Sequence, residues 1–221
     1  MSFAGLVLDT GKMVIQLPDK KRQKAQKIIS EAHHSRSVSL FDIQKITGYL
    51  NFVSTIVPPG RTFLRRIYNM ELYFPPQAAT YHKRRISGEA HKDLAWWSEV
   101  LQHSPERSIA PRSGDVIRAW SDAASTQGLE GYYLRQGQRH PEPNSAFSIP
   151  LPLSIAKGRE HINTQEMRAV KQVLLYWAPM WKGKTLVMHV DNRAVAHGIA
   201  NRTIRGGSMQ VLRRCLLLAS E

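Results

Sequence analysis

The spacing of the apolar residues changes near residue 110 of this 221-residue sequence, and this change strongly constrains the fold. Before it, apolar residues recur every three or four positions over long segments, which predicts amphipathic helices. After it, short alternating segments separated by turn residues predict strands, and further helices follow. The segment 102–114 between the two patterns is rich in Ser, Pro and Arg and has no sustained apolar period. We therefore expect a mixed α/β fold in two domains, residues 1–110 and 111–221.

The first domain is expected to be small and mainly helical. Its second helix has the clearest beginning, because Ser39 and Asp42 have the spacing of a capping box. Two short strands, 3–8 and 13–17, are expected to precede helices at 19–34, 39–53, 61–70 and 87–101.

The second domain is expected to hold a mixed sheet with packed helices. Strands at 116–122, 129–135 and 146–151 are consistent with a meander. A helix capped by Asn163 or Thr164 should follow. The remaining elements are an apolar strand at 184–191 and helices at 193–200 and 208–220.

The chain is strongly basic, with 31 Lys and Arg residues against 17 Asp and Glu residues and a formal net charge of +14. The excess is divided evenly between 1–110 and 111–221. Such a field concentrates polyanions, so nucleic acid is the first partner to consider and an anionic membrane the second, while a merely soluble basic protein remains an alternative.

Cationic residues gather at the beginning of the first helix, where they oppose the helix dipole. Phosphate contact would explain them, and an ordinary solvated charged face would as well. The candidate nucleic-acid-binding residues are Lys20, Lys21, Arg22, Lys24, Lys27, Arg61, Arg65, Arg66, Arg202 and Arg205.

The single cysteine, Cys215, cannot form an internal disulfide or a cysteine-based zinc site, which fits a reducing compartment. No apolar run reaches the roughly 20 residues that a membrane span requires, and the first eight residues are too few for a signal peptide. We therefore expect a soluble intracellular protein, in the cytoplasm or the nucleus.

Three acids of the second domain occupy unusual places. Asp122 and Asp191 end predicted strands, and Glu166 lies in the first turn of a predicted helix. If the strands are neighbours and the helix packs across them, the three carboxylates converge. Such a cluster would repel itself unless it bound hard cations, and oxygen ligands suit Mg²⁺ or Mn²⁺. Two ions about 4 Å apart would stabilise the attacking water and the departing oxygen in phosphodiester cleavage.

Each acid alone has a simpler interpretation. Glu166 would compensate the helix dipole, and Asp122 or Asp191 would cap a turn or a helix. Only the set of three, in strand, helix, strand order, favours the interpretation as a metal site.

Short motifs in the second half resemble the RNase H domain of fungal retroelements of the DIRS or Ty3 type. They are Trp120-Ser121-Asp122-Ala123-Ala124, His161 to Met167 and His189 to Val195, in the order and spacing of that family. In the first half, Phe3 to Leu6 and Ile15 to Pro18 resemble the end of a reverse-transcriptase palm. Gly48 to Phe52 and Val57 to Arg61 resemble its thumb and connection.

The resemblance implies that Asp122, Glu166 and Asp191 hold two Mg²⁺ (or Mn²⁺) ions and hydrolyse the RNA strand of an RNA/DNA hybrid. It also implies that the palm aspartates and a closing segment with a fourth carboxylate are missing. We therefore expect a C-terminally truncated RNase H-like domain without polymerase activity, whose endonuclease activity is impaired.

Two alternatives remain open at this point. One is a nuclease-dead module that binds nucleic acid, and the other is a degenerate element remnant that acts as an interaction scaffold. The expected partners are an RNA/DNA hybrid and, in addition, other retroelement proteins, whereas no membrane partner is expected.

Overall fold

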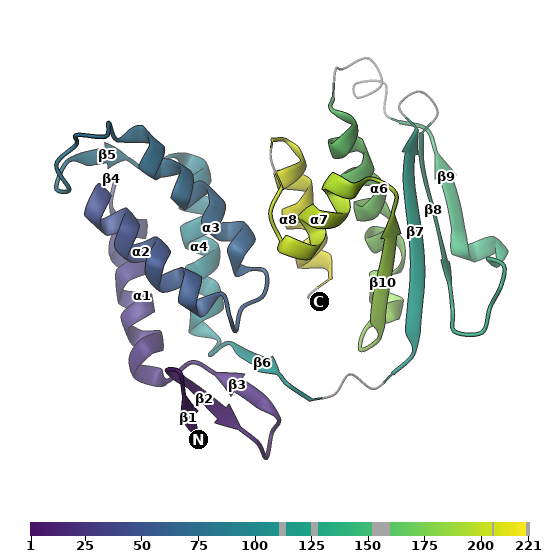
Figure 1. Cartoon of the computed structure of the whole chain (residues 1–221), viewed down its shortest axis with the longest axis horizontal. Coiled ribbons are helices and arrows are strands. Elements are labelled where there is room, and N and C mark those ends of the chain that lie inside the picture. Colours follow the sequence, from purple (N-terminus) through teal and green to yellow (C-terminus); the bar gives the residue numbers. More distant parts are fainter. Residues whose placement is uncertain (111–113, 125–127, 152–159, 205, 220–221) are drawn as a thin grey trace. The chain divides into compact units, whose positions relative to one another are not determined.

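The computed structural model describes residues 1–110, 114–124, 128–151, 160–204 and 206–219. The chain divides into two compact units, Met1–Pro111 and Arg112–Glu221 (Figure 1). The predicted mixed α/β fold is confirmed, since a helical unit precedes a unit with a mixed sheet and packed helices.

The first unit begins with a small antiparallel sheet in the order β1-β2-β3-β6. Its strands are β1 (Ser2–Phe3), β2 (Leu6–Asp9), β3 (Val14–Gln16) and β6 (Glu106–Ser108). The single strand expected at 3–8 is wrong, because Ala4 and Gly5 adopt φ angles of 50° and 78° and form a turn within it. Strand β6 was not predicted, because its three residues are all exposed and give no apolar signal.

Four helices form the core of the first unit. They are α1 (Asp19–His34), α2 (Leu40–Val53), α3 (Gly60–Asn69), which continues as the short helix η1 (Met70–Tyr73), and α4 (Gly88–Gln102). The predicted capping box at the beginning of α2 is confirmed, because Ser39 Oγ accepts from the Asp42 N–H and the Asp42 carboxylate accepts from the Ser39 N–H. Apolar side chains from all four helices share one core, with Trp97 fully buried in it.

A two-stranded antiparallel sheet was not predicted. Strands β4 (Ser37–Ser39) and β5 (Lys83–Arg85) pair so that Ser37 lies opposite Arg85. Apart from Val38 the paired residues are polar or charged, so their sequence carries no alternation of apolar and polar residues.

The second unit contains a four-stranded sheet in the order β10-β7-β8-β9. Strands β7 (Val116–Ala124), β8 (Gly128–Leu134) and β9 (Ala146–Ile149) form the predicted antiparallel meander, with η2 (Pro143–Ser145) before β9. Strand β10 (Thr185–Val190) pairs with β7 in parallel.

The described residues of this unit form helix α6 (Ile162–Trp177), which is followed by the short helix η3 (Ala178–Trp181), and then helices α7 (Arg193–Asn201) and α8 (Ser208–Leu218). Helix α6 lies against β7, β8 and α8 (Figure 1). The expected cap of α6 is wrong, because the N-cap is His161, whose side chain accepts a hydrogen bond from the Asn163 N–H.

Side chains along β7 alternate between two environments. Ile117, Ala119, Ser121 and Ala123 are buried, whereas the residues between them are more exposed. One face of the sheet therefore belongs to the core under α6, and the other carries Trp120 and Asp122.

No helix among the described residues combines the length and the apolar character needed to cross a membrane.

Candidate metal centre

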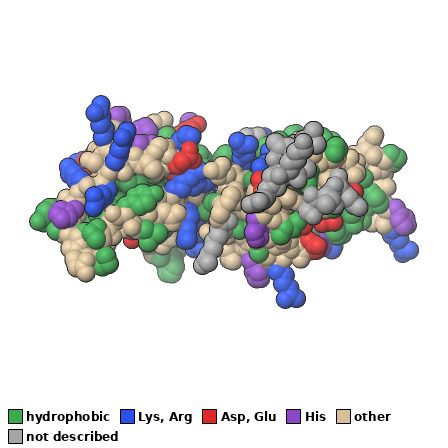
Figure 2. Space-filling model, turned by 90° about the horizontal axis from the view of Figure 1, so that it is seen from above, with side chains coloured by type: hydrophobic (Ala, Val, Ile, Leu, Met, Phe, Trp, Pro, Cys, Tyr) green, Lys and Arg blue, Asp and Glu red, His purple; other side chains and the backbone are tan. Residues whose placement is uncertain are grey.

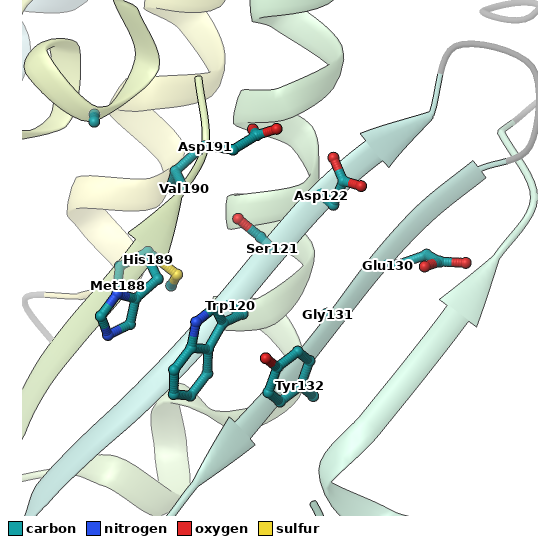
Figure 3. Close-up of a pocket in the computed structure, with 11 residues that line it drawn as sticks. Trp120, Ser121, Asp122, Glu130, Gly131, Tyr132, Met188, His189, Val190 and Asp191 are labelled. Carbon is teal, nitrogen blue, oxygen red and sulfur yellow. The ribbon is translucent and has the colours of Figure 1, made fainter. Parts of the chain in front are cut away.

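Three acidic side chains of the second unit converge. One oxygen from each of Asp122, Glu166 and Asp191 lies within 4.8 Å of the others. Asp122 belongs to β7, Glu166 to α6, and Asp191 directly follows β10. Asp122 and Asp191 are drawn in Figure 3, where they stand at the same end of their neighbouring strands.

The parallel pairing of β7 and β10 brings the two aspartates together. In this register Val190 lies opposite Ser121, so Asp191 follows β10 at the level where Asp122 follows Ser121 on β7. Helix α6 packs against both strands and adds Glu166 from the core side. Distant parts of the sequence thus supply the three carboxylates.

Two details differ from the prediction. Strand β7 continues to Ala124, so Asp122 lies within it and not at its end. Glu166 is the fifth residue of α6 and lies outside its first turn, which has no acid. Its side chain is 4% exposed, so compensation of the helix dipole does not explain this glutamate.

The environment of Glu166 opposes its negative charge. Burial, and to a smaller extent the negative charges of Asp191 and Asp122, together raise the pKa of its carboxyl from 4.5 to about 7. A hydrogen bond from the Ala123 backbone acts in the opposite direction. Glu166 Oε2 is buried and has no hydrogen-bond partner in the structure. A buried carboxylate oxygen without a partner is costly, and a cation would satisfy it.

The donor set fits a hard divalent cation. All three ligating groups are carboxylates, and oxygen donors suit Mg²⁺ and Mn²⁺. Among the described residues, no other group of three His, Cys, Asp or Glu side chains is arranged to hold a metal ion.

A cavity of 650 Å³ adjoins the two aspartates on the face of the sheet that carries Trp120 (Figure 3). Trp120 stacks between Tyr132 and His189, with ring centroids 4.8 and 4.5 Å apart. This row of rings lines the cavity together with Asp122 and Asp191. The sequence did not predict the row, because its three members come from three strands whose register is not visible in the sequence.

Three of the predicted nucleic-acid-binding residues on α1 interact with neighbouring side chains. Lys21 Nζ lies 4.2 Å from the centroid of the Phe52 ring, and Lys24 Nζ lies 5.5 Å from that of Tyr49. Arg22 pairs with Asp19 at 3.0 Å. These side chains therefore also contribute to the packing of the first unit.

The other predicted basic residues differ in exposure. Arg66 is held between Glu89, at 2.7 Å, and the buried Asp93, at 3.5 Å, which joins α3 to α4. Arg202 is the C-cap residue that follows α7 and has a φ angle of 56°, and Arg205 lies outside the described residues. The exposed members of the whole predicted set are Lys20, Lys24, Lys27, Arg61 and Arg65.

No protein-family model matches the sequence, and no curated protein matches it. Similar solved structures are those of a foamy viral protease-reverse transcriptase. The form called dRH, in complex with double-stranded DNA, has 14% identity and a TM-score of 0.40 over 100% of this chain and 36% of that one. The protease-reverse transcriptase with double-stranded DNA has 14% identity and a TM-score of 0.40, over 99% and 42% of the two chains. Its complex with an RNA/DNA hybrid has 14% identity and a TM-score of 0.36, over 100% and 27%.

This chain spans less than half the length of these viral proteins. At such identities and TM-scores the likeness assigns no role to any residue. The case for a function therefore depends on the geometry of the second unit.

Proposed function

We propose that this chain binds nucleic acid and that its second unit hydrolyses the RNA strand of an RNA/DNA hybrid with divalent cations. The convergence of Asp122, Glu166 and Asp191 within 4.8 Å carries this proposal. A cluster of negative charge in a chain of net charge +14 is the arrangement expected where cations and a polyanion are to meet.

The three carboxylates would hold the cations, which when bound activate a water molecule and stabilise the leaving oxygen of a phosphodiester. Asp122 and Asp191, both exposed, offer their oxygens to the cavity side. Glu166 binds from the core side and fixes the depth of the site, because α6 and the sheet hold its backbone.

Glu166 also couples cation binding to pH. Without metal its carboxyl holds a proton up to about pH 7, and this proton must leave before both oxygens can act as ligands. Affinity for Mg²⁺ should therefore rise between pH 6 and about pH 8.

The resemblance of the short motifs to fungal retroelements supports the choice of an RNA/DNA hybrid as substrate. In the same interpretation, the first unit corresponds to the thumb and connection region of a reverse transcriptase. It would hold the hybrid through exposed cations such as Lys20, Lys27, Arg61 and Arg65.

The decisive experiment uses a hybrid with a label on either strand. The protein should shorten the RNA strand in the presence of Mg²⁺ or Mn²⁺ and leave the DNA strand intact, and chelation should stop the reaction. Asp122→Asn should reduce the rate at least a hundredfold, since it removes a ligand charge.

Asp115→Asn is the matched control, because Asp115 lies in the same unit, its side chain is 70% exposed, and it pairs only weakly with Lys184 at 3.5 Å. This variant should retain the wild-type rate. Equal cleavage by the wild type and Asp122→Asn would overturn the catalytic assignment. If the wild type and the variants all bind the hybrid tightly and none of them cleaves it, the chain acts only as a nucleic-acid-binding module.

A further inference from the structure

A basic hollow lies in the first unit, apart from all the predicted site residues. Its volume is 930 Å³, and it is lined by Arg36, Ser37, Arg85, Ile86, Ser87, Gly88 and His91. Figure 2 shows Lys and Arg side chains standing out on the left-hand part of the surface, with His side chains among them.

The β4–β5 pairing builds this hollow. Arg36 directly precedes β4, and Arg85 ends β5 opposite Ser37. The Arg36 carbonyl accepts a hydrogen bond from the Ile86 N–H at 3.0 Å, which fixes the backbones that carry the two arginines. Arg36 and Arg85, which come from distant parts of the sequence, therefore line one cavity.

The two arginines have no anionic partner within the described part of the protein. None of the ion pairs found there includes Arg36 or Arg85. Glu89, the acid in the first turn of α4, is engaged elsewhere, since it pairs with Arg66 and Lys92. Uncompensated cations that share a cavity repel each other, and a bound anion would remove this repulsion.

Neutral donors complete the lining. Ser37 and Ser87 add hydroxyl groups, and helix α4 begins at Gly88 on the wall of the hollow. A Cβ atom built on Gly88 would meet no atom within 4 Å, so the backbone at this point is open to a ligand. Arginine forks, hydroxyls and backbone N–H groups are the donors that proteins direct at phosphate oxygens.

We propose that this hollow binds backbone phosphates of nucleic acid without reading the base sequence. The inference depends on the proposed function only for the choice of nucleic acid as the polyanion. Strand β5 continues the positive charge beyond the hollow, since the exposed Lys83 lies two residues before Arg85 and therefore on the same face of the strand. An extended row of cations suits a polymer with a charge on every repeat better than it suits a single free phosphate.

The test is the salt dependence of hybrid binding by the full chain in a chelating buffer, so that cleavage cannot occur. Fluorescence anisotropy of a labelled RNA/DNA hybrid is measured between low and moderate salt for the wild type and for Arg36→Gln/Arg85→Gln. The plot of log affinity against log salt should lose about two units of slope, because each phosphate contact contributes nearly one. Two hybrids of unrelated sequence should give the same loss.

The matched control is Lys12→Gln/Arg139→Gln, which removes the same charge at two exposed residues that do not line the hollow. Its slope should stay close to that of the wild type. Circular dichroism melts should show that both double variants remain folded. The inference would be overturned if Arg36→Gln/Arg85→Gln had the same salt slope as the control. It would also be overturned if the wild type did not bind the hybrid.

Two further experiments identify the kind of molecule that supplies the phosphate. Inorganic phosphate that displaces the hybrid far better than chloride of equal ionic strength would indicate a site for free phosphate and contradict the proposal. Exposed rings of Phe41 and Tyr81 lie near the same strands, so vesicles with anionic headgroups are also tested. Vesicle binding that depends on the two arginines, without hybrid binding, would assign the surface to a membrane.

The salt slope and the cleavage of RNA together separate the phosphate-site proposal from the proposed nuclease function. A changed salt slope without any RNA cleavage would support the phosphate site and reject the nuclease. Cleavage with an unchanged slope would support the nuclease and reject the phosphate site.

Discussion

The side-chain amide of Asn192 donates a hydrogen bond to Asn163, with 2.9 Å between Nδ2 and Oδ1. Asn163 lies in the first turn of α6, and Asn192 directly follows Asp191. Asn192 also caps α7, since its Oδ1 accepts from the Val195 N–H at 3.1 Å. This one contact therefore joins the loop that carries Asp191 to the helix that carries Glu166.

Removal of this contact should loosen the metal centre. Asn163→Ala breaks the side-chain bond alone and should lower the free energy of unfolding by about 1 kcal/mol. Asn192→Ala also removes the α7 cap and should cost about 2 kcal/mol. Both variants should bind Mg²⁺ more weakly than the wild type, measured by calorimetry. The double variant provides the control: if the two losses in stability simply add, the amides are not coupled.

The raised pKa of Glu166 predicts how stability depends on pH in the metal-free protein. The folded protein holds this proton up to about pH 7, whereas the unfolded chain releases it near 4.5. Between these values the folded state binds more protons, so the contribution of Glu166 to stability falls as the pH rises. This loss is spread over the range from about pH 4.5 to about pH 7.

Glu166→Gln tests this prediction, because glutamine keeps the shape of the side chain and cannot ionise. In a chelating buffer the variant should match the wild type at pH 4 and be more stable at pH 8, as measured by urea unfolding. A variant that is less stable than the wild type at pH 8 would show that the ionised carboxylate is well solvated or paired.

The acids of the candidate site could be predicted from the sequence more readily than several elements of the fold. Asp122 and Asp191 stand out because each follows apolar residues that form a strand, where a charge is costly unless a cation or a hydrogen-bond donor lies nearby. The parallel pairing that brings them together depends on a contact between β7 and β10 across more than 60 residues, which no local pattern encodes.

Strands β4, β5 and β6 were not predicted, and each is only three residues long. All side chains of β5 and β6 are exposed, so no burial pattern marks them. Strand β4 buries Val38 but is equally short. Because the basic hollow is built on β4 and β5, its arginines were also missing from the predicted binding residues.

Gly131 sets how closely α6 approaches the sheet. A Cβ atom at this position would lie 2.7 Å from Val173 Cγ2 and 2.8 Å from Phe147 Cε1. Gly131→Ala should therefore lower the free energy of unfolding by about 1–3 kcal/mol through overpacking. Gly48→Ala makes the same chemical change within α2, where the new Cβ would meet nothing within 4 Å. It should raise stability by up to about 1 kcal/mol, so thermal melts of the pair should shift in opposite directions.

Cys215 offers a direct probe of the second unit. Its side chain is 3% exposed, and burial raises the pKa of the thiol to about 12. At pH 8 only about one molecule in ten thousand would carry the thiolate, so a thiol reagent should label the folded protein very slowly. The chain has no other cysteine, so the signal is unambiguous.

The rate of labelling should report cation binding at the cluster of Asp122, Glu166 and Asp191. Cys215 Sγ lies 3.9 Å from the carbonyl oxygen of Met167, the residue after Glu166, so the thiol becomes accessible only when α8 separates from α6. Mg²⁺ at ten times its dissociation constant should stabilise the folded unit by about 1.4 kcal/mol and slow labelling about tenfold. Asp191→Asn should lose this protection, while Asp115→Asn should keep it. Equal protection of all three proteins would mean that Mg²⁺ acts elsewhere than at the cluster of acids.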